Sequence, residues 1–201
     1  MIRVMPIGKI HSRAAAKEAA HERIVAAAAR AILRSGYDGT GVAEIMKDAG
    51  LTHGAFYAHF ASREAMLAEA AGRACAESAA AATAAAARAR PGQAMTSMLR
   101  AYLSKAHCEQ AEGGCPLVAL GSETARQSPE VRRVATRYIK EMIDLVARQS
   151  PDWGRPAAHQ RALTTISTMV GAVLLARAVD DPVLSERLRE AALAHLEDVK
   201  R

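Results

Sequence analysis

The chain has 201 residues, of which 50% are hydrophobic and 3% aromatic, and its formal net charge is +6. This length fits one large domain or two small ones, and abundant alanine with few aromatic residues favours helices over strands. Residues 1–17 contain no continuous apolar stretch of the kind that forms a signal peptide. The most apolar segment, 161–177, is interrupted by threonine and serine and falls short of the ~20 apolar residues that cross a bilayer. The three cysteines show no disulfide-framework spacing, so we expect a cytoplasmic protein without membrane contact.

Positive charge is concentrated at the N-terminus. Before Glu18 there is no acidic residue, and the basic residues are Arg3, Lys9, Arg13 and Lys17. We interpret residues 1–17 as a basic arm that follows DNA phosphates or enters a minor groove. A solvated, disordered tail is the alternative interpretation.

The rest of the chain is predicted to form about nine helices and no strand. In the first helix, apolar residues recur at helical spacing from Ile24 to Ile32, and Gly36 follows where a helix end favours a left-handed residue. Thr40, Thr52 and Ser62 are predicted N-caps of the next three helices. The helices are expected at residues 15–35, 40–49, 53–59, 62–90 and 93–110, from 116, from 129, at 157–179 and from 182.

The segment 40–63, TGVAEIMKDAGLTHGAFYAHFASR, contains two short helices joined by a tight turn at Ala49-Gly50-Leu51. The first of these helices is too short to be stable alone, so residues 15–35 are expected to bury its apolar face. Three helices in this order predict a helix-turn-helix unit whose last helix enters a DNA major groove.

In this segment the sequence resembles the TetR family of repressors. The matching residues are Thr40, Ile45, Ala49-Gly50-Leu51-Thr52, Gly54, Phe56-Tyr57, His59-Phe60 and Ser62-Arg63. Met46 departs from the small residue that is usual in the family, and the resemblance covers residues 18–70. It implies an all-α chain, with a DNA-binding helix-turn-helix at 18–62 and a helical ligand-binding and dimerisation domain at 63–201.

The resemblance also implies the DNA contacts. Thr40, Thr52 and Arg63 would bind phosphates, and Tyr57 and His59 would reach the DNA backbone. His53, Gly54 and Ala55 would face base edges. None of these three is the Arg or Asn that reads a base by two hydrogen bonds, so we expect specificity from thymine methyl groups and DNA shape. As alternatives, Tyr57 could pack, His53 could be an idle surface residue and His59 could be structural.

The C-terminal region is expected to dimerise and to bind an inducer. By the resemblance, the last two helices form a four-helix bundle across a two-fold axis, giving a homodimer through residues 157–199. The helix at 157–179 has little polar face, which supports an interface, although a buried central helix of a monomer is the alternative. An apolar small-molecule inducer would lie among side chains that could equally be ordinary core: Met95, Met98, Leu99, Tyr102, Leu117, Met142, Trp153 and Met169.

Cys108 and Cys115 flank a Gly-Gly loop, so they are either a redox pair or two inert buried thiols. With His107 they give one ligand too few for a zinc site, and we expect no metal and no cofactor. Because no catalytic motif is present, we expect no enzymatic activity.

The function predicted from the sequence is that of a ligand-released repressor that binds a palindromic operator as a homodimer. Ligand would move the helix at 62–90, which joins the DNA-binding unit at Ser62-Arg63. A constitutive DNA-binding protein without an inducer, a thiol-based redox-sensing repressor and a helical adaptor that binds another protein through residues 157–199 are the alternatives.

Overall fold

The computed structural model describes residues 7–110 and 112–198, with residues 7–12 described by their backbone alone. Over these ranges the chain is helical and contains no strand, so the predicted all-α class is confirmed. The helices are α1 (Ile7–Ser35), α2 (Val42–Asp48), the 3₁₀ helix η1 (His53–Ala58), α3 (Arg63–Ala87), α4 (Ala94–Tyr102), α5 (Lys105–Glu109), α6 (Pro116–Thr124), α7 (Pro129–Ala147), α8 (Pro156–Ala178) and α9 (Pro182–Asp198).

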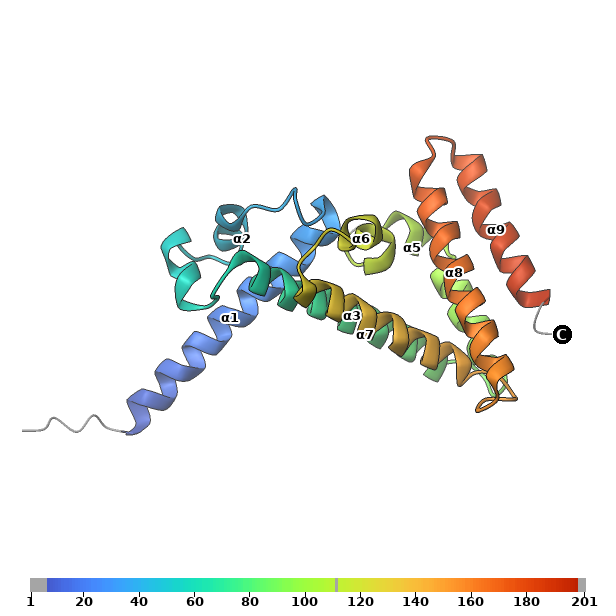
Figure 1. Cartoon of the computed structure of the whole chain (residues 1–201), viewed down its shortest axis with the longest axis horizontal. Coiled ribbons are helices and arrows are strands. Elements are labelled where there is room, and N and C mark those ends of the chain that lie inside the picture. Colours follow the sequence, from blue (N-terminus) through green and yellow to red (C-terminus); the bar gives the residue numbers. More distant parts are fainter. Residues whose placement is uncertain (1–6, 111, 199–201) are drawn as a thin grey trace, which may run out of the picture.

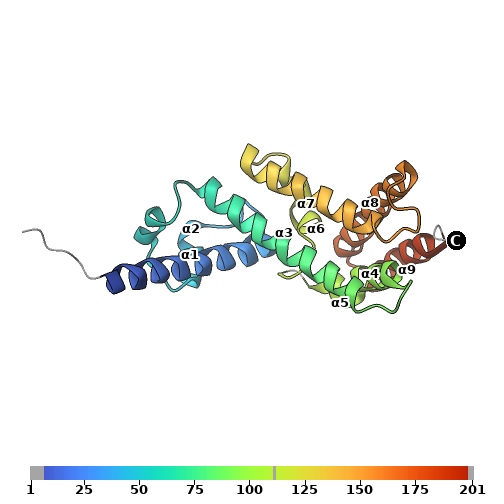
Figure 2. The ribbon, with the colours of Figure 1, turned by 90° about the horizontal axis from the view of Figure 1, so that it is seen from below.

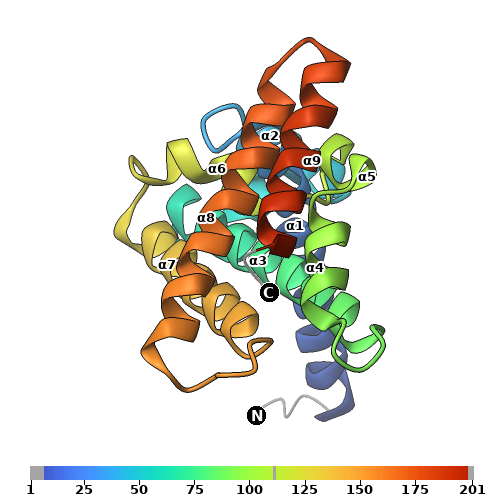
Figure 3. The same cartoon turned by 90° about the vertical axis from the view of Figure 1, so that its right-hand side faces the viewer.

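The molecule is elongated (Figure 1). At one end α1, α2 and η1 form a small unit, and at the other end α8 and α9 form a helical hairpin. The long helices α3 and α7 lie side by side and connect the two ends, as the turned view also shows (Figure 2). Seen from the hairpin end, α8 and α9 lie next to each other in front of the rest of the molecule (Figure 3). None of the helices in the described ranges has the length and hydropathy that spanning a membrane requires.

One hydrophobic core holds the N-terminal unit together. It joins α1, α2 and η1 to the first half of α3 through fully buried side chains that include Ile24, Ile45, Phe56 and Met66. Helices as short as α2 and η1 do not persist in isolation, so this burial stabilises them. Leu120 of α6 and Val131 of α7 belong to the same core, which therefore extends into the C-terminal half of the chain.

Two further cores lie in the C-terminal region. One packs α4, α5 and α6 against α8 and α9 and includes Leu99, Val118 and Val173. The other packs α3 and α4 against α7 and α8 and includes Tyr138 and Val146. Met95 and Leu117 touch both cores, so the C-terminal helices form one continuous packed body.

The start of α1 differs from the sequence prediction. The helix begins at Ile7 rather than near residue 15, and residues 1–6 of the predicted basic arm lie outside the described residues. Residues 13–19 are all exposed, so this part of the helix has no apolar stripe from which the sequence could have predicted it. Its helical conformation depends on the high helix propensity of alanine alone.

The predicted helix at 93–110 is two helices, α4 and α5, which gives ten helices in the described ranges instead of about nine. The break lies at Ser104. Its hydroxyl donates to Ala101 O at 2.8 Å and accepts from His107 N at 3.1 Å, so it caps α5. Serine interrupts a helix in this way because its hydroxyl competes for the backbone groups.

The turn from 36 to 40, which follows α1, is held by a side chain from the other half of the molecule. Gly36 has φ +74°, which confirms the predicted left-handed residue after the first helix. Tyr37 N donates to Glu123 Oε2 of α6 at 2.8 Å. The positive φ is what favours glycine here, and a Cβ atom on residue 36 would in addition push aside the Glu123 carboxylate, the flexible end of its side chain.

We therefore expect Gly36→Ala to lower the free energy of unfolding by about 1–3 kcal/mol, because alanine is strained at positive φ and must displace the carboxylate. Urea unfolding followed by circular dichroism measures this change. Gly121→Ala in α6 is the matched control, since a Cβ there meets open space and alanine favours the helix. Equal stability of Gly36→Ala and the wild type would mean that the close approach of Glu123 is not maintained in solution.

Candidate nucleic-acid interface and ligand cavity

The 3₁₀ helix η1 presents a row of exposed residues on the outside of the N-terminal unit. Thr52, His53 and Gly54 are exposed at its start, and Tyr57 is 75% exposed one turn later. Phe56, on the opposite side of η1, is 3% exposed and anchors the helix in the first core. This exposure favours a surface role for Tyr57 over the alternative of a packing residue, and its only ring contact among the described residues is an edge-on one with Phe56, with centroids 5.2 Å apart.

The two predicted N-cap threonines differ. Thr52 occupies the N-cap position of η1, and its exposed hydroxyl makes no capping hydrogen bond. Thr40 is 3% exposed, and Gly41 occupies the N-cap position of α2, so the predicted cap at Thr40 is wrong. The Thr40 hydroxyl donates to Gly36 O at 2.6 Å. A hydroxyl has one proton to donate, so Thr40 fastens the turn and its side chain is not free to bind a phosphate.

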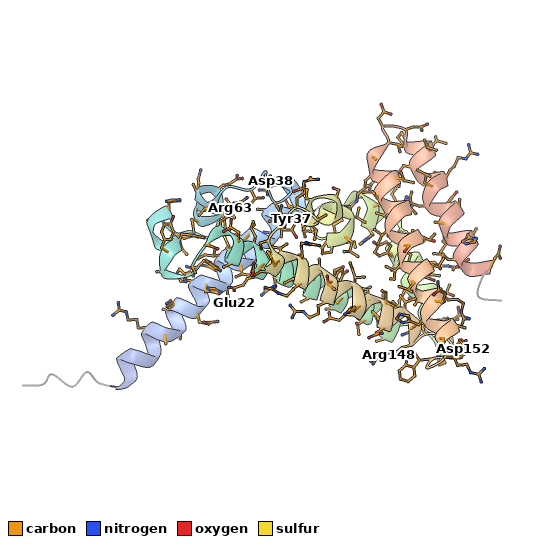
Figure 4. The ribbon with its side chains drawn as sticks, viewed as in Figure 1. Glu22, Tyr37, Asp38, Arg63, Arg148 and Asp152 are labelled. Carbon is orange, nitrogen blue, oxygen red and sulfur yellow. The ribbon has the colours of Figure 1, made fainter. Side chains whose placement is uncertain are left out.

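Arg63, the first residue of α3, points toward the same turn (Figure 4). Its guanidinium donates to Tyr37 O and, at 3.2 Å, to Thr40 O. One terminal nitrogen of Arg63 thus links α3 to the turn after α1, and the predicted phosphate contact of its remaining donors stays a prediction. Ser62, directly before it, caps α3 as predicted by accepting from Ala65 N at 3.1 Å.

His59 lies half-buried between η1 and α1. Its Nδ1 atom is buried and has no hydrogen-bond partner among the described residues. Burial lowers the pKa of His59, and His21 and Lys17 lower it further. These features favour the structural interpretation of His59 over a contact with DNA.

His21 is a residue that sequence reasoning missed. Its Nε2 lies 2.6 Å from Glu69 Oε2, and its ring stacks on Phe60 with centroids 4.6 Å apart. It thereby joins α1 to α3 beside His59. The partners are 48 residues apart in the chain, and no local pattern could have paired them.

A cavity of about 140 Å³ lies in the C-terminal region among α3, α4, α5, α7 and α8. Its lining residues are Ser78, Ala81, Ala82, Ala85, Met98, Ala101, Tyr102, His107, Gln110, Gly113, Met142 and Met169. Four predicted ligand-binding residues are thus brought together: Met98, Tyr102, Met142 and Met169.

The other four predicted ligand-binding residues lie elsewhere. Met95 and Leu99 line a separate, smaller cavity of about 50 Å³, and Leu117 packs between the two C-terminal cores. Trp153 is 61% exposed in the turn between α7 and α8, with the Arg148 guanidinium 5.6 Å from its ring (Figure 4 labels Arg148). The prediction that Trp153 lines the cavity is wrong. The sequence of a loop does not show whether an aromatic ring faces the protein interior or the solvent.

Two polar atoms in the cavity wall have no hydrogen-bond partner in the described part of the chain. They are Tyr102 Oη and His107 Nε2, both buried, in rings whose centroids are 4.7 Å apart. Burial raises the pKa of Tyr102, with the Cys115 thiol adding to the effect. Burial lowers the pKa of His107, and the Arg177 guanidinium lowers it further. Both side chains are therefore uncharged near neutral pH.

All three cysteines are free and buried, with Cys108 7% and Cys115 1% exposed. Burial raises the pKa of the Cys75 thiol to about 12. Since the thiolate is the reactive form and needs access to an oxidant, this burial supports the inert interpretation of the thiols. Across 7–110 and 112–198, no group of three or more potential ligands is arranged to hold a metal ion.

The cavity and the N-terminal unit are connected by the segment from α5 to α6. Arg177 of α8 donates to Cys108 O at 2.8 Å and to His107 O and Gln110 O at 3.0 Å, which fixes the backbone behind the cavity. A few residues further along, Glu112 pairs with Arg34 of α1 at 3.1 Å. At the end of α6, Glu123 holds the turn after α1 as described above.

The lowered pKa of His107 predicts a dependence of stability on pH. The unfolded chain protonates this histidine near pH 6.5, whereas the folded chain does so at lower pH. The free energy of unfolding therefore falls as pH drops below about 6.5. We expect His107→Gln to reduce this loss, as measured by urea midpoints at pH 7.5 and 5.5. His195→Gln, at an exposed position of α9, controls for removal of a histidine as such. An unchanged pH dependence in His107→Gln would contradict the proposed burial.

An N-terminal helix-turn-helix with an exposed recognition helix, fused to a helical body with an internal cavity, defines a class of DNA-binding regulators. Comparison with known proteins places the chain within that class. Residues 24–70 match the model of bacterial regulatory proteins of the tetR family. Residues 91–194 match the C-terminal domain of transcriptional regulators like LmrA and YxaF. The chain belongs to the TetR family, which confirms the resemblance found in the sequence; it is a transcriptional regulator and not an enzyme.

Individual relatives agree with this assignment. The chain is 27% identical to a helix-turn-helix-type transcriptional regulator of Mycobacterium tuberculosis over 193 residues, which covers 90% of this chain and 97% of the relative. It is 26% identical to the regulator LmrA of Bacillus subtilis over 158 residues, 77% of this chain and 84% of LmrA.

Solved structures show the same fold. A TetR regulator from Chloroflexus aurantiacus has a TM-score of 0.75 and 28% identity, with 90% of this chain and 94% of that one covered. The reduced form of NemR from E. coli has a TM-score of 0.76 and 22% identity, with 89% of this chain and 95% of that one covered.

Proposed function

We propose that this chain is a ligand-released repressor that binds a palindromic operator as a homodimer. The observation that supports it most is the exposed face of η1, where Thr52, His53, Gly54 and Tyr57 face solvent while Phe56 fixes the helix in the first core. In this arrangement Thr52 and Tyr57 donate to phosphates, and His53 and Gly54 lie against base edges. Ala55, half-buried against the first core, contributes its methyl group at most.

We also propose a division into two domains. We place the helix-turn-helix domain at 18–62 and the ligand-binding and dimerisation domain at 63–201, with α3 as the connecting helix. In the segment proposed as the basic arm, Arg13 and Lys17 are exposed on the first turns of α1, where they can add phosphate contacts.

The first experiment selects genomic fragments bound by the purified protein and measures their affinity at two salt concentrations. We expect one palindromic site, and we expect Tyr57→Ala to weaken binding to it about 10- to 100-fold, because a hydrogen bond to a charged phosphate contributes ~1.5–3 kcal/mol. The melting temperature of this variant is expected to stay unchanged, since Tyr57 is 75% exposed.

Trp153→Ala is the matched control, because it removes another exposed aromatic ring, in the turn between α7 and α8, which Figure 1 shows at the opposite end of the molecule from α2. It is expected to leave operator affinity unchanged. Weak, sequence-blind binding by the wild type would count against the repressor proposal and in favour of the adaptor alternative.

The homodimer proposal is supported by apolar side chains that a single chain leaves exposed on α8 and α9. They are Leu163, Leu174, Leu175, Val183 and Leu184. Several large exposed apolar side chains on two neighbouring helices are typical of a protein interface. A two-fold axis through the α8–α9 hairpin also allows two η1 helices to read half-sites one DNA turn apart.

We expect Leu175→Glu to convert the dimer into a monomer, because it places two carboxylates in an apolar interface. Sedimentation velocity measures the mass, and fragment binding measures the accompanying loss of operator affinity. Ile139→Glu on α7 is the control, since Ile139 is 37% exposed but lies outside α8 and α9. A dimer that persists in Leu174→Glu/Leu175→Glu would exclude this face as the interface.

Release by ligand is supported by the contacts that run from the cavity to the turn after α1. A molecule in the cavity touches His107, Gln110 and Gly113, which lie on the segment that leads through Glu112 and α6 to Glu123. Moving Glu123 loosens the turn that positions α2 and the first residues of α3. A coupling of ~1–3 kcal/mol would change operator affinity about 5- to 150-fold.

A further inference from the structure

The cavity in the C-terminal region has a specific chemical character. Most of its wall is apolar and consists of alanine and methionine side chains from α3, α4, α7 and α8. Tyr102 Oη and His107 Nε2 stand out as buried polar atoms without a hydrogen-bond partner. The Cys115 thiol lies near Tyr102 Oη, but the two groups do not meet with the geometry of a hydrogen bond, and a thiol is a weak partner in any case. Buried polar groups are almost always hydrogen-bonded, so two neighbouring buried atoms without a partner require an explanation. The nearby Tyr138 hydroxyl, by contrast, has a hydrogen-bond partner, because it donates to Ser78 Oγ at 2.9 Å.

The charges around the cavity disfavour an ionic ligand. No lysine, arginine, aspartate or glutamate belongs to its wall. Arg177 is close, but its Nε and one of its terminal nitrogens are directed at the backbone oxygens of His107, Cys108 and Gln110. A carboxylate in the cavity would therefore find no cationic side chain in the wall to pair with, which disfavours it relative to a neutral ligand.

A ligand hydroxyl is the group that complements the two free atoms. A neutral imidazole has one donor and one acceptor nitrogen, and which of them is Nε2 depends on the tautomer. If Nε2 is an acceptor, a ligand hydroxyl donates to it and accepts from Tyr102. If Nε2 carries the proton, the same hydroxyl accepts from it and donates to Tyr102 Oη. A carbonyl oxygen satisfies only the second arrangement.

The cavity volume limits the size of the ligand. At about 140 Å³ it is close to the volume of an apolar protein cavity that holds one benzene molecule, ~150 Å³. We propose that this cavity binds a small neutral molecule with an apolar body the size of one aromatic ring and one hydroxyl group, which lies between Tyr102 Oη and His107 Nε2. Binding of this molecule in the cavity does not depend on the proposed function. Only its role as the effector that releases DNA rests on the proposed function.

The test compares two probes of nearly equal size, p-cresol and toluene, by calorimetric titration of the full-length protein without DNA. We expect p-cresol to bind at least about tenfold more tightly, because one pair of hydrogen bonds separates the two probes. Tyr102→Phe and His107→Leu are each expected to reduce p-cresol affinity to that of toluene and to leave toluene affinity unchanged.

Tyr138→Phe is the matched control, since its hydroxyl is already bonded to Ser78 and the residue is not part of the cavity wall. It is expected to keep the preference for p-cresol. Tyr102→Phe removes a buried hydroxyl without a partner, so its melting temperature is expected to equal or exceed that of the wild type. His107→Leu provides a second test should Tyr102→Phe fold poorly.

Equal affinities for toluene and p-cresol in the wild type would overturn the proposal, as would the absence of binding by either probe. Benzaldehyde binding as tightly as p-cresol would overturn the assignment of a hydroxyl. Operator release is measured separately by fluorescence anisotropy of labelled DNA. Tyr102-dependent binding of p-cresol without release supports the ligand chemistry and contradicts only the ligand-release function. Release by a molecule that has no hydroxyl and that displaces p-cresol from the cavity contradicts the ligand chemistry alone.

Discussion

The turn between α1 and α2 is the point on which the arrangement of the N-terminal unit depends. Thr40 fastens it from within through Gly36 O, and Arg63 binds two of its backbone oxygens. Glu123 accepts from its Tyr37 N–H. Four elements therefore meet at the five residues of this turn, 36–40: the end of α1, the start of α2, the start of α3 and the end of α6. Because α2 has seven residues and η1 has six, neither is stable alone. The turn fixes the start of α2, and the first core holds both short helices.

The two functional regions are not separate bodies joined by a linker. Leu120 and Val131 belong to the same hydrophobic core as Ile45 and Phe56, although they lie in the C-terminal half of the chain. A displacement of α6 or α7 must therefore be accommodated by repacking beneath the recognition helix. Close-packed cores do not deform continuously, so such a displacement favours a second discrete arrangement. In the mechanism proposed above, this shared core is the route by which a ligand in the cavity would act on η1.

The sequence was sufficient for the helical class, the helix-turn-helix and the family, because each depends on local periodicity, turn residues and a motif in one register. It could not assign individual roles. A threonine before a helix looks the same whether its hydroxyl caps that helix or, like Thr40, bonds to the preceding turn. The pair of His21 with Glu69 and the meeting of Tyr102 with His107 depend on how the helices pack. The split at Ser104 was readable in principle, since serine at that position can cap, but the apolar pattern continued through it.

Arg177 has a consequence for selectivity. Its guanidinium is held beside the cavity by three backbone oxygens, so its positive charge stays in place whether or not a ligand is present. The same charge that helps to keep His107 unprotonated repels a protonated amine entering the cavity. Lipophilic amines, which are cations at neutral pH, would enter only after giving up their proton. If the cavity binds the proposed ligand, the charge of Arg177 would favour neutral aromatic compounds over cationic ones of similar shape.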